Sequence, residues 1–199
     1  MQSVYGILRA KAVPNVDRMA LSFSDDVHGT IAFLEPKGIC VIPKTIREVL
    51  DAIGCILDAL TVSQVYKSSP TSSSSSSQVM HQEPDRIFHR DIRWPNVIKS
   101  ADDPRKWILI DWDDAGTPPT LAVTHLDDCN HSPAVFKDNH GSEVDVWGVG
   151  LLIKDCAPSM PGFPSELLRL GKAMQSGTLD VPKCIERIIA LKAVFMDES

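Results

Sequence analysis

The sequence predicts an α+β fold in which a few short strands come first and helices dominate the rest of the chain. Residues 30–34 (TIAFL) are a short apolar run followed by proline and glycine, which is typical of a strand that enters a turn. From residue 45 onward, apolar side chains recur at three- and four-residue steps, as in an amphipathic helix. A second apolar run, KWILID at 106–111, predicts a buried strand that ends on Asp111.

The helix that begins at residue 45 has the clearest pattern. Thr45 and Glu48 match a capping box, in which the two side chains satisfy backbone amides that the first helical turn leaves without partners. The apolar stripe that follows predicts one buried helix face, formed by Ile46, Val49, Leu50, Ile53, Ile56, Leu57 and Leu60.

Two further helices are expected at 165–174, with Ser165 as its cap, and at 182–195, entered through Asp180 and Pro182. The run EVDVWGVGLLI at 143–153 fits either a strand or a helix by periodicity alone. The Ser-rich stretch at 67–84 has little to bury, and we expect a disordered insertion on the surface there.

Composition limits the classes of partner and compartment. The chain has 199 residues and 43% apolar content, which suits one globular domain. Its net charge of -6, without a run of basic residues, argues against a nucleic acid or an anionic membrane as partner. Five scattered cysteines without a CxxC pair indicate reduced, mostly buried thiols, with neither disulfides nor zinc.

No segment predicts export or membrane insertion. The first residues lack the apolar centre of a signal peptide. The best apolar run, at 144–153, is half of the ~20 residues that a membrane-spanning helix needs. We therefore expect an intracellular protein, in the cytoplasm or the nucleus.

Three oxygen-bearing side chains stand close together between residues 88 and 116. Asp91 and Asn96 are five residues apart on a predicted loop, and Asp111 ends a predicted strand. Magnesium prefers oxygen ligands and keeps water and phosphate oxygens in its remaining positions, so two protein ligands suffice. One further carboxylate near a substrate hydroxyl completes the minimum that phosphoryl transfer requires.

These residues carry a resemblance to the protein kinase superfamily. HRDIRWPN at 89–96 resembles the catalytic loop HRDxxxxN, and DWD at 111–113 stands where DFG stands. DVWGVG at 145–150 resembles the large central helix of the kinase C-lobe, which favours a helix at 143–153, and HSPAVF at 131–136 takes the place of the APE element. Within the superfamily, the chain is most similar to fungal-type protein kinases, from about residue 13 to its end.

The resemblance implies roles for individual residues. Asp91 would orient the substrate hydroxyl and accept its proton, and Arg93 would face the γ-phosphate. Asn96 and Asp111 would hold Mg²⁺. The FLEPKG segment would be the hinge that meets the adenine of ATP, through Leu34, Glu35 and Lys37.

The same resemblance implies an organisation and a partner. Residues 1–38 would hold the remaining N-lobe strands and the hinge, and residues 39–199 a kinase-like C-lobe. Asp145 would be a structural anchor for the catalytic loop. The cofactors would be ATP and Mg²⁺, and the acceptor a Ser or Thr hydroxyl of a protein substrate.

Several elements of a working kinase are absent from the sequence. There is no GxGxxG, and Lys11 lies too close to the VPNV segment to serve as the phosphate-binding lysine. Asp113 replaces the glycine of DFG, and Ala134 the glutamate of APE. Activity is therefore doubtful, and a pseudokinase-like module that binds a partner protein is the alternative. A small-molecule phosphotransferase is a third, because DWDDAG resembles the DWEDAG of aminoglycoside and choline kinases.

The remaining conspicuous side chains receive structural roles. His89 is expected to pack and to contact the backbone, and Trp94, Trp112 and Trp147 to be core aromatics. Arg90 fits either a phosphate contact or a simple ion pair. His125, His131 and His140 have no metal-ligand spacing and are assigned no role.

Overall fold

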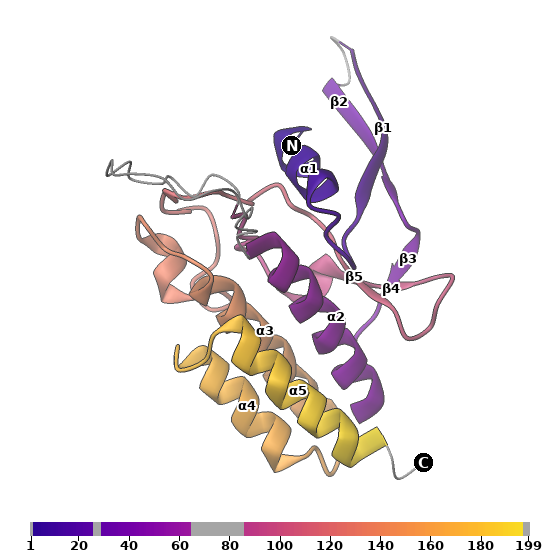
Figure 1. The fold of residues 1–199 in the computed structure, drawn as a ribbon, viewed down its shortest axis with the longest axis vertical. Helices are drawn as coiled ribbons and strands as arrows, with labels where there is room; N and C mark the ends of the chain where they lie inside the picture. Colours follow the sequence, from indigo (N-terminus) through magenta and orange to yellow (C-terminus); the bar gives the residue numbers. More distant parts are fainter. Residues whose placement is uncertain (1, 26–28, 65–85, 197–199) are drawn as a thin grey trace, which may run out of the picture.

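The fold described by the computed structural model has a helical part and a smaller part of strands and one helix (Figure 1). It covers residues 2–25, 29–64 and 86–196. The predicted Ser-rich insertion lies outside these described residues. The α+β class predicted from the sequence is confirmed by five α-helices and two small antiparallel sheets in the described residues.

The helical part is built on α2 (Ile46–Gln64), which packs against α3 (Glu143–Cys156) and α5 (Val181–Met196). α4 (Ser165–Gln175) packs mainly on α3. These two helices approach closely at Gly150 and Gly171, since a Cβ at Gly150 would lie 2.6 Å from the Gly171 carbonyl oxygen. The predicted stripe of α2 is fully buried at Val49, Leu50, Ile53, Ile56, Leu57 and Leu60.

Helix starts follow the predicted capping residues in two of three cases. Thr45 Oγ1 accepts the Glu48 amide at 3.2 Å, and Glu48 Oε2 accepts the Lys44 amide at 2.7 Å, one residue earlier than a standard capping box. Asp180 Oδ1 accepts the Lys183 amide at 3.0 Å. The predicted cap at Ser165 is wrong: this residue is already helical, and its hydroxyl bonds to Glu166 instead of a backbone amide.

The smaller part begins with α1 (Gln2–Ala10), followed by an antiparallel hairpin of β1 (Arg18–Asp25) and β2 (Gly29–Glu35). The strand predicted at 30–34 is confirmed as β2. Neither α1 nor β1 was predicted from the sequence. α1 lies against β1 and buries Tyr5 and Leu8, so the hairpin and the helix depend on each other for a common apolar contact.

A second antiparallel sheet joins the two parts in the order β3 (Gly38–Cys40), β4 (Val97–Ser100), β5 (Trp107–Leu109). The strand predicted at 106–111 is confirmed but ends earlier, at Leu109. The β4–β5 turn is held by Ser100 Oγ, which accepts the amides of Asp102 and Asp103 at 3.2 and 3.3 Å. This agrees with a turn at these aspartates.

The two predictions about the cysteines, that they are free and that most are buried, have different outcomes. All five cysteines are free, as predicted, but the prediction that most are buried is wrong. Cys156 and Cys184 are buried in helices, whereas Cys40 on a short strand and Cys129 on a loop are exposed.

Among the described helices, none has the length and apolarity that crossing a membrane would require.

Candidate active site

The loop at 88–96 is fixed by hydrogen bonds to a buried carboxylate of α3, that of Asp145. Asp145 is fully buried, and its Oδ2 accepts the His89 amide at 2.9 Å and the Gln64 side-chain amide at 2.7 Å. Its Oδ1 accepts the Arg90 amide at 2.7 Å. The expected structural role of Asp145 is confirmed, because its three partners orient the backbone immediately before Asp91.

The side chain of Asp91 lies at the centre of a hydrogen-bond network. Its Oδ1 accepts Arg93 Nε at 2.8 Å and faces His131 Nε2 at 2.7 Å. Its Oδ2 accepts Asn96 Nδ2 at 2.7 Å, and the same nitrogen donates to the Asp91 carbonyl at 2.9 Å. The structure thus brings Asp91, Arg93 and Asn96 together, and it adds a histidine that the sequence analysis had left without a role.

The electrostatics of this network favour an ionised Asp91. Its burial, with 4% of the residue exposed, would raise its pKa. Hydrogen bonds from His131, Arg93 and Asn96 outweigh this effect and hold the pKa below its usual range. Conversely, the hydrogen bond to Asp91 raises the pKa of His131 against the opposing effect of burial.

Asp111 follows β5, one residue after the position at which the chain bonds to the 88–96 loop. The amide of Ile110 donates to the Asn96 carbonyl at 2.9 Å, so the chain after β5 runs beside the end of η1 (Trp94–Asn96). Asp111 has a positive φ of 66° and an exposed side chain. Such a backbone is uncommon outside glycine and is concentrated at functional sites.

A cleft of about 520 Å³ joins Asp111 to the predicted hinge. Its lining includes Leu34 and Pro36, which follow one another closely at the predicted hinge, and the two carboxylates of Asp111 and Asp113. Its other lining residues are Tyr5, Asp17, Ala32, Ile98 and Ile110. The cleft therefore combines apolar walls with carboxylates, although Asn96 does not line it.

The other two predicted hinge residues lie elsewhere. Glu35 lines a separate hollow, and the exposed Lys37 lines none of the described pockets. The Lys37 carbonyl accepts the Ala101 amide at 3.1 Å and so ties this segment to the β4–β5 turn. Of the three predicted adenine contacts, Leu34 alone faces the cleft that contains Asp111.

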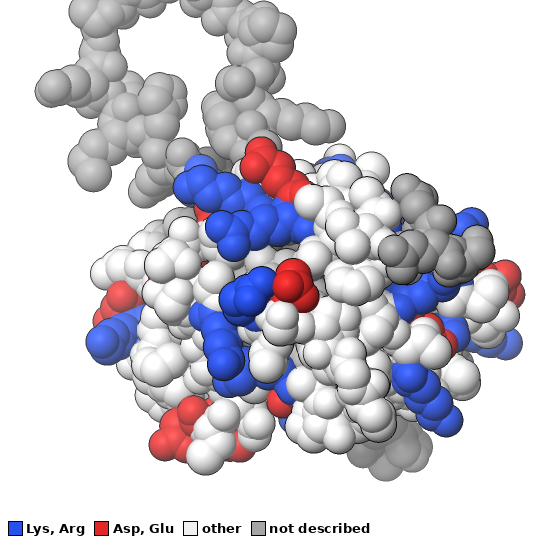
Figure 2. Space-filling view, turned by 90° about the horizontal axis from the view of Figure 1, so that it is seen from below, with Lys and Arg blue, Asp and Glu red and all other residues white. Residues whose placement is uncertain are grey.

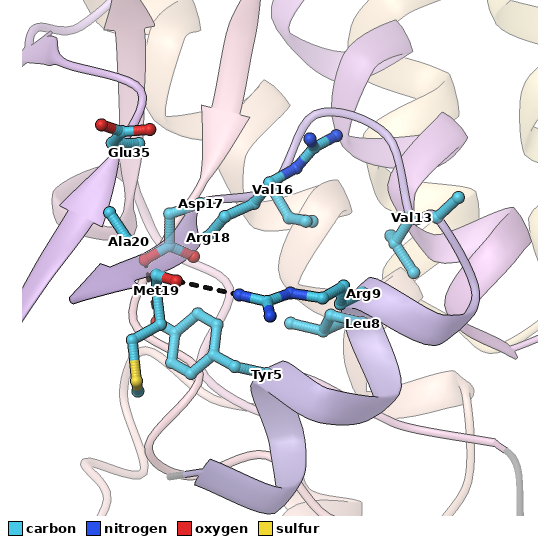
Figure 3. A pocket seen from close by; sticks show the side chains of 11 residues that line it. Tyr5, Leu8, Arg9, Val13, Val16, Asp17, Arg18, Met19, Ala20 and Glu35 are labelled. Carbon is cyan, nitrogen blue, oxygen red and sulfur yellow. Dashed lines mark hydrogen bonds between the residues drawn. The ribbon is translucent and has the colours of Figure 1, made fainter. Parts of the chain in front are cut away.

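The separate hollow, of about 400 Å³, lies between α1 and β1 (Figure 3). Tyr5 and Arg9 of α1 extend toward the start of β1, where Arg9 donates to the Met19 carbonyl at 3.0 Å. The Tyr5 hydroxyl donates to Asp17 Oδ2 at 2.8 Å, whereas Asp17 Oδ1 is buried with no hydrogen-bond partner. Burial is the main cause that raises the pKa of Asp17 to about 6.

Two places could hold a divalent cation. Asp111 offers an exposed carboxylate in the cleft, and Asn96 Nδ2 is turned to Asp91, which leaves the Asn96 amide oxygen for another partner. These oxygen donors suit Mg²⁺. In the described chain, Asp127, Asp128 and Cys129 also bring ligand atoms within 4.8 Å of one another, but all three are exposed and their thiol is a poor magnesium ligand.

Other side chains near the site have structural contacts. His89 is buried and its Nε2 lies 3.0 Å from the Ile110 carbonyl, which confirms its expected role. Arg90 donates to the backbone carbonyl oxygens of Asp114 and Leu121. The phosphate contact considered for this residue stays a prediction. Trp94 and Trp112 are core residues, whereas Trp147 is half-buried.

Sequence reasoning missed His131 and Asp17. Neither belongs to a ligand-spacing pattern, because their partners lie far away in the chain. The available signal for His131 was its position at the start of HSPAVF, the segment compared with the kinase APE element. Asp17 follows directly after the VPNV segment.

Figure 2 shows basic side chains gathered over the upper and central part of one face, with smaller groups of acidic side chains among and around them. The expectation that nucleic acid is not a partner stays a prediction.

Comparisons with known proteins give one partial likeness. No family model matches the chain. Crinkler effector protein 8 of Phytophthora infestans is 33% identical over 158 residues, which cover 77% of this chain and 22% of that protein. The chain thus spans about a fifth of the length of the curated relative that it resembles.

Proposed function

We propose that the chain is a protein kinase-like domain of the fungal type, built to transfer the γ-phosphoryl group of ATP to a Ser or Thr hydroxyl of a protein. The observation that carries this proposal is the cleft that is lined both by Leu34 and Pro36, from the predicted hinge, and by Asp111. Distant segments thus contribute an apolar surface for a base and a carboxylate for a metal.

The 88–96 loop supports the same proposal. Asp91 is ionised and held by its neighbours, as a base needs to be before it receives a hydroxyl proton. Arg93 contacts Asp91 through Nε, and its side chain is 44% exposed, so the guanidinium reaches solvent at the site. A cation in this position stabilises the charge of a transferring phosphoryl group.

Mg²⁺ held by Asp111 and the Asn96 amide oxygen would neutralise phosphate charge and orient the nucleotide. The chain's own contribution is to position these ligands: Asn96 is tied to Asp91, and its carbonyl accepts the Ile110 amide. The same side chain therefore links the expected base to the expected metal site.

Nucleotide affinity should be low. The sequence contains no GxGxxG loop, and Lys11 lies too close to the VPNV segment to serve as the lysine that holds the α- and β-phosphates.

A calorimetric titration with ATP and Mg²⁺ should therefore give a Kd weaker than about 100 µM. A micromolar Kd would contradict this expectation.

Phosphate transfer is tested with Asp91→Asn. Labelled ATP is supplied with Mg²⁺ and a protein acceptor, and a parallel reaction contains choline or an aminoglycoside to test the small-molecule alternative. Any transfer to protein should fall by about 10³-fold in Asp91→Asn with nucleotide affinity unchanged. Asp155→Asn, an exposed carboxylate on α3, is the matched control. Equal transfer by Asp91→Asn and the wild type would contradict the role of Asp91.

A second candidate is a non-catalytic module that binds a partner protein. It is favoured by large apolar side chains that are exposed on or near β1, β2 and β3: Leu21, Phe33, Ile39 and Ile42, at 60%, 53%, 59% and 54%. A folded wild-type chain that neither binds ATP nor transfers phosphate would support this candidate over the first.

A further inference from the structure

The two ring nitrogens of His131 both face oxygen atoms. Nδ1 lies 2.6 Å from the Asp127 carbonyl oxygen, and Nε2 lies 2.7 Å from Asp91 Oδ1. A carbonyl oxygen accepts but cannot donate, so Nδ1 carries a proton. The hydrogen bonds from its neighbours favour an ionised Asp91, which is also an acceptor. Beside an ionised Asp91, Nε2 carries a second proton, and the ring is a cation paired with Asp91 inside the protein.

We propose that His131 is a positioning residue for Asp91, which fixes Oδ1 and leaves Oδ2 to receive the substrate hydroxyl. The proposal rests on the proposed function. Oδ1 already has two donors, Arg93 Nε and His131 Nε2. Oδ2 has Asn96 Nδ2 as its donor, and a carboxylate oxygen has room for a second. The acceptor hydroxyl would thus be bound beside Asn96.

Burial separates this pair from an ordinary surface pair. The side chains of His131 and Asp91 are 6% and 5% exposed. The pair of His125 and Asp114 has a similar separation of 2.9 Å, but the histidine side chain is 68% exposed. Solvent screens the second pair, whereas the first one is protected from water.

The segment that carries His131 is held by the same helix that holds the Asp91 loop. Val135 is buried with Val123 and Val144 in a small apolar cluster, and the Val123 amide donates to the Val135 carbonyl at 3.0 Å. Val144 precedes Asp145, which anchors the loop before Asp91. Adjacent residues of α3 therefore fix the two sides of the pair.

The charged groups that face His131 are few among the described residues. Asp91 raises its pKa and Arg93 lowers it, both from the 88–96 loop. On its own segment, the Asp127 carbonyl accepts its Nδ1 proton, and His131 in turn contributes to lowering the pKa of the exposed Asp127 carboxylate. Because Asp91 dominates, its removal should change the titration of His131 most.

The direct test is an NMR titration of the histidine rings in the wild type and in Asp91→Asn. In the wild type, His131 should titrate above the ordinary value of about 6.5. In Asp91→Asn its midpoint should fall, because the hydrogen bond to Asp91 is the main cause that raises the His131 pKa. An unchanged His131 midpoint would overturn the proposal, and this readout does not depend on phosphate transfer.

Kinetics test the positioning role. His131→Leu should lower kcat by about 10- to 100-fold with little change in KM for ATP, and His131→Gln, which keeps a donor near Nε2, should restore part of the loss. His125→Leu is the matched control. Equal kcat in His131→Leu and the wild type would overturn the role. If the wild type transfers no phosphate, the proposed function fails, and the NMR titration still decides whether His131 holds Asp91.

Discussion

The two halves of the candidate site are built in opposite ways. Asp91 is 4% exposed and is held by Arg93, Asn96 and His131. Asp111 is exposed, lies beyond the end of β5, and has no hydrogen bond to its side chain among the described residues. The first half is organised by the protein itself, whereas the second presents a carboxylate to the cleft. This difference suits a fixed base beside a site that a cation completes.

The largest effect should come from removing the anchor of the buried half. Asp145→Ala leaves the amides of His89, Arg90 and Gln64 without their acceptor inside the protein. Because buried unsatisfied donors are costly, the free energy of unfolding should fall by about 3–5 kcal/mol, as measured by urea denaturation.

Asp155→Ala is the control for this measurement, since Asp155 is exposed on the same helix. It should change the free energy of unfolding by less than about 0.5 kcal/mol. If the two variants were equally stable, Asp145 would not anchor the loop.

The cleft that contains Asp111 is also lined by a buried carboxylate, that of Asp17. This carboxylate should make the free energy of unfolding depend on pH. Its folded-state pKa is raised to about 6, so the folded chain keeps this proton to a higher pH than the unfolded chain. Its contribution to stability is present below about pH 4 and is lost as pH rises to about 6. The loss is about 3 kcal/mol, because the pKa of Asp17 rises from its ordinary value of 3.8 to about 6.

Asp17→Asn isolates this effect, because it cannot ionise. Urea denaturation at pH 4 and pH 7 should show a larger fall in stability for the wild type than for the variant. Parallel pH dependences in the two proteins would show that Asp17 is not the group responsible.

A smaller contrast compares the two expected metal ligands. Asn96→Ala removes a buried donor to the Asp91 carbonyl and to Oδ2, and should cost about 1–3 kcal/mol of folding free energy. Asp111→Asn keeps a residue that tolerates positive φ and should cost less than about 0.5 kcal/mol. If thermal or urea unfolding showed equal losses of folding free energy in the two variants, Asn96 would not be more important for stability than Asp111.

α2 could be predicted from the sequence because its apolar stripe repeats over many residues, and it begins within one residue of the expected start. The periodicity of residues 143–153 left strand and helix open, and the resemblance to the kinase C-lobe favoured the helix that α3 confirms. α1 was missed because it is short and its stability depends on contact with β1 rather than on a local capping signal.

The site was predictable to a smaller extent. Asp91, Arg93 and Asn96 are close in sequence and meet in the fold, and Asp111 was correctly placed after a strand. The contact between His131 and Asp91 depends on the path of residues 127–136, which brings His131 against the 88–96 loop. No local sequence pattern specifies this path. Likewise, nothing in the sequence sets the side to which Glu35 or Lys37 points.

The central proposal is that a divalent cation binds to Asp111, which lines the cleft, together with the amide oxygen of Asn96. The most direct measurement is the paramagnetic broadening of backbone NMR signals by Mn²⁺ with ATP, which detects weak binding. The account predicts the strongest broadening at residues 96 and 110–113, and a large reduction in Asp111→Asn. Broadening centred on residues 127–129, or unchanged by Asp111→Asn, would contradict it.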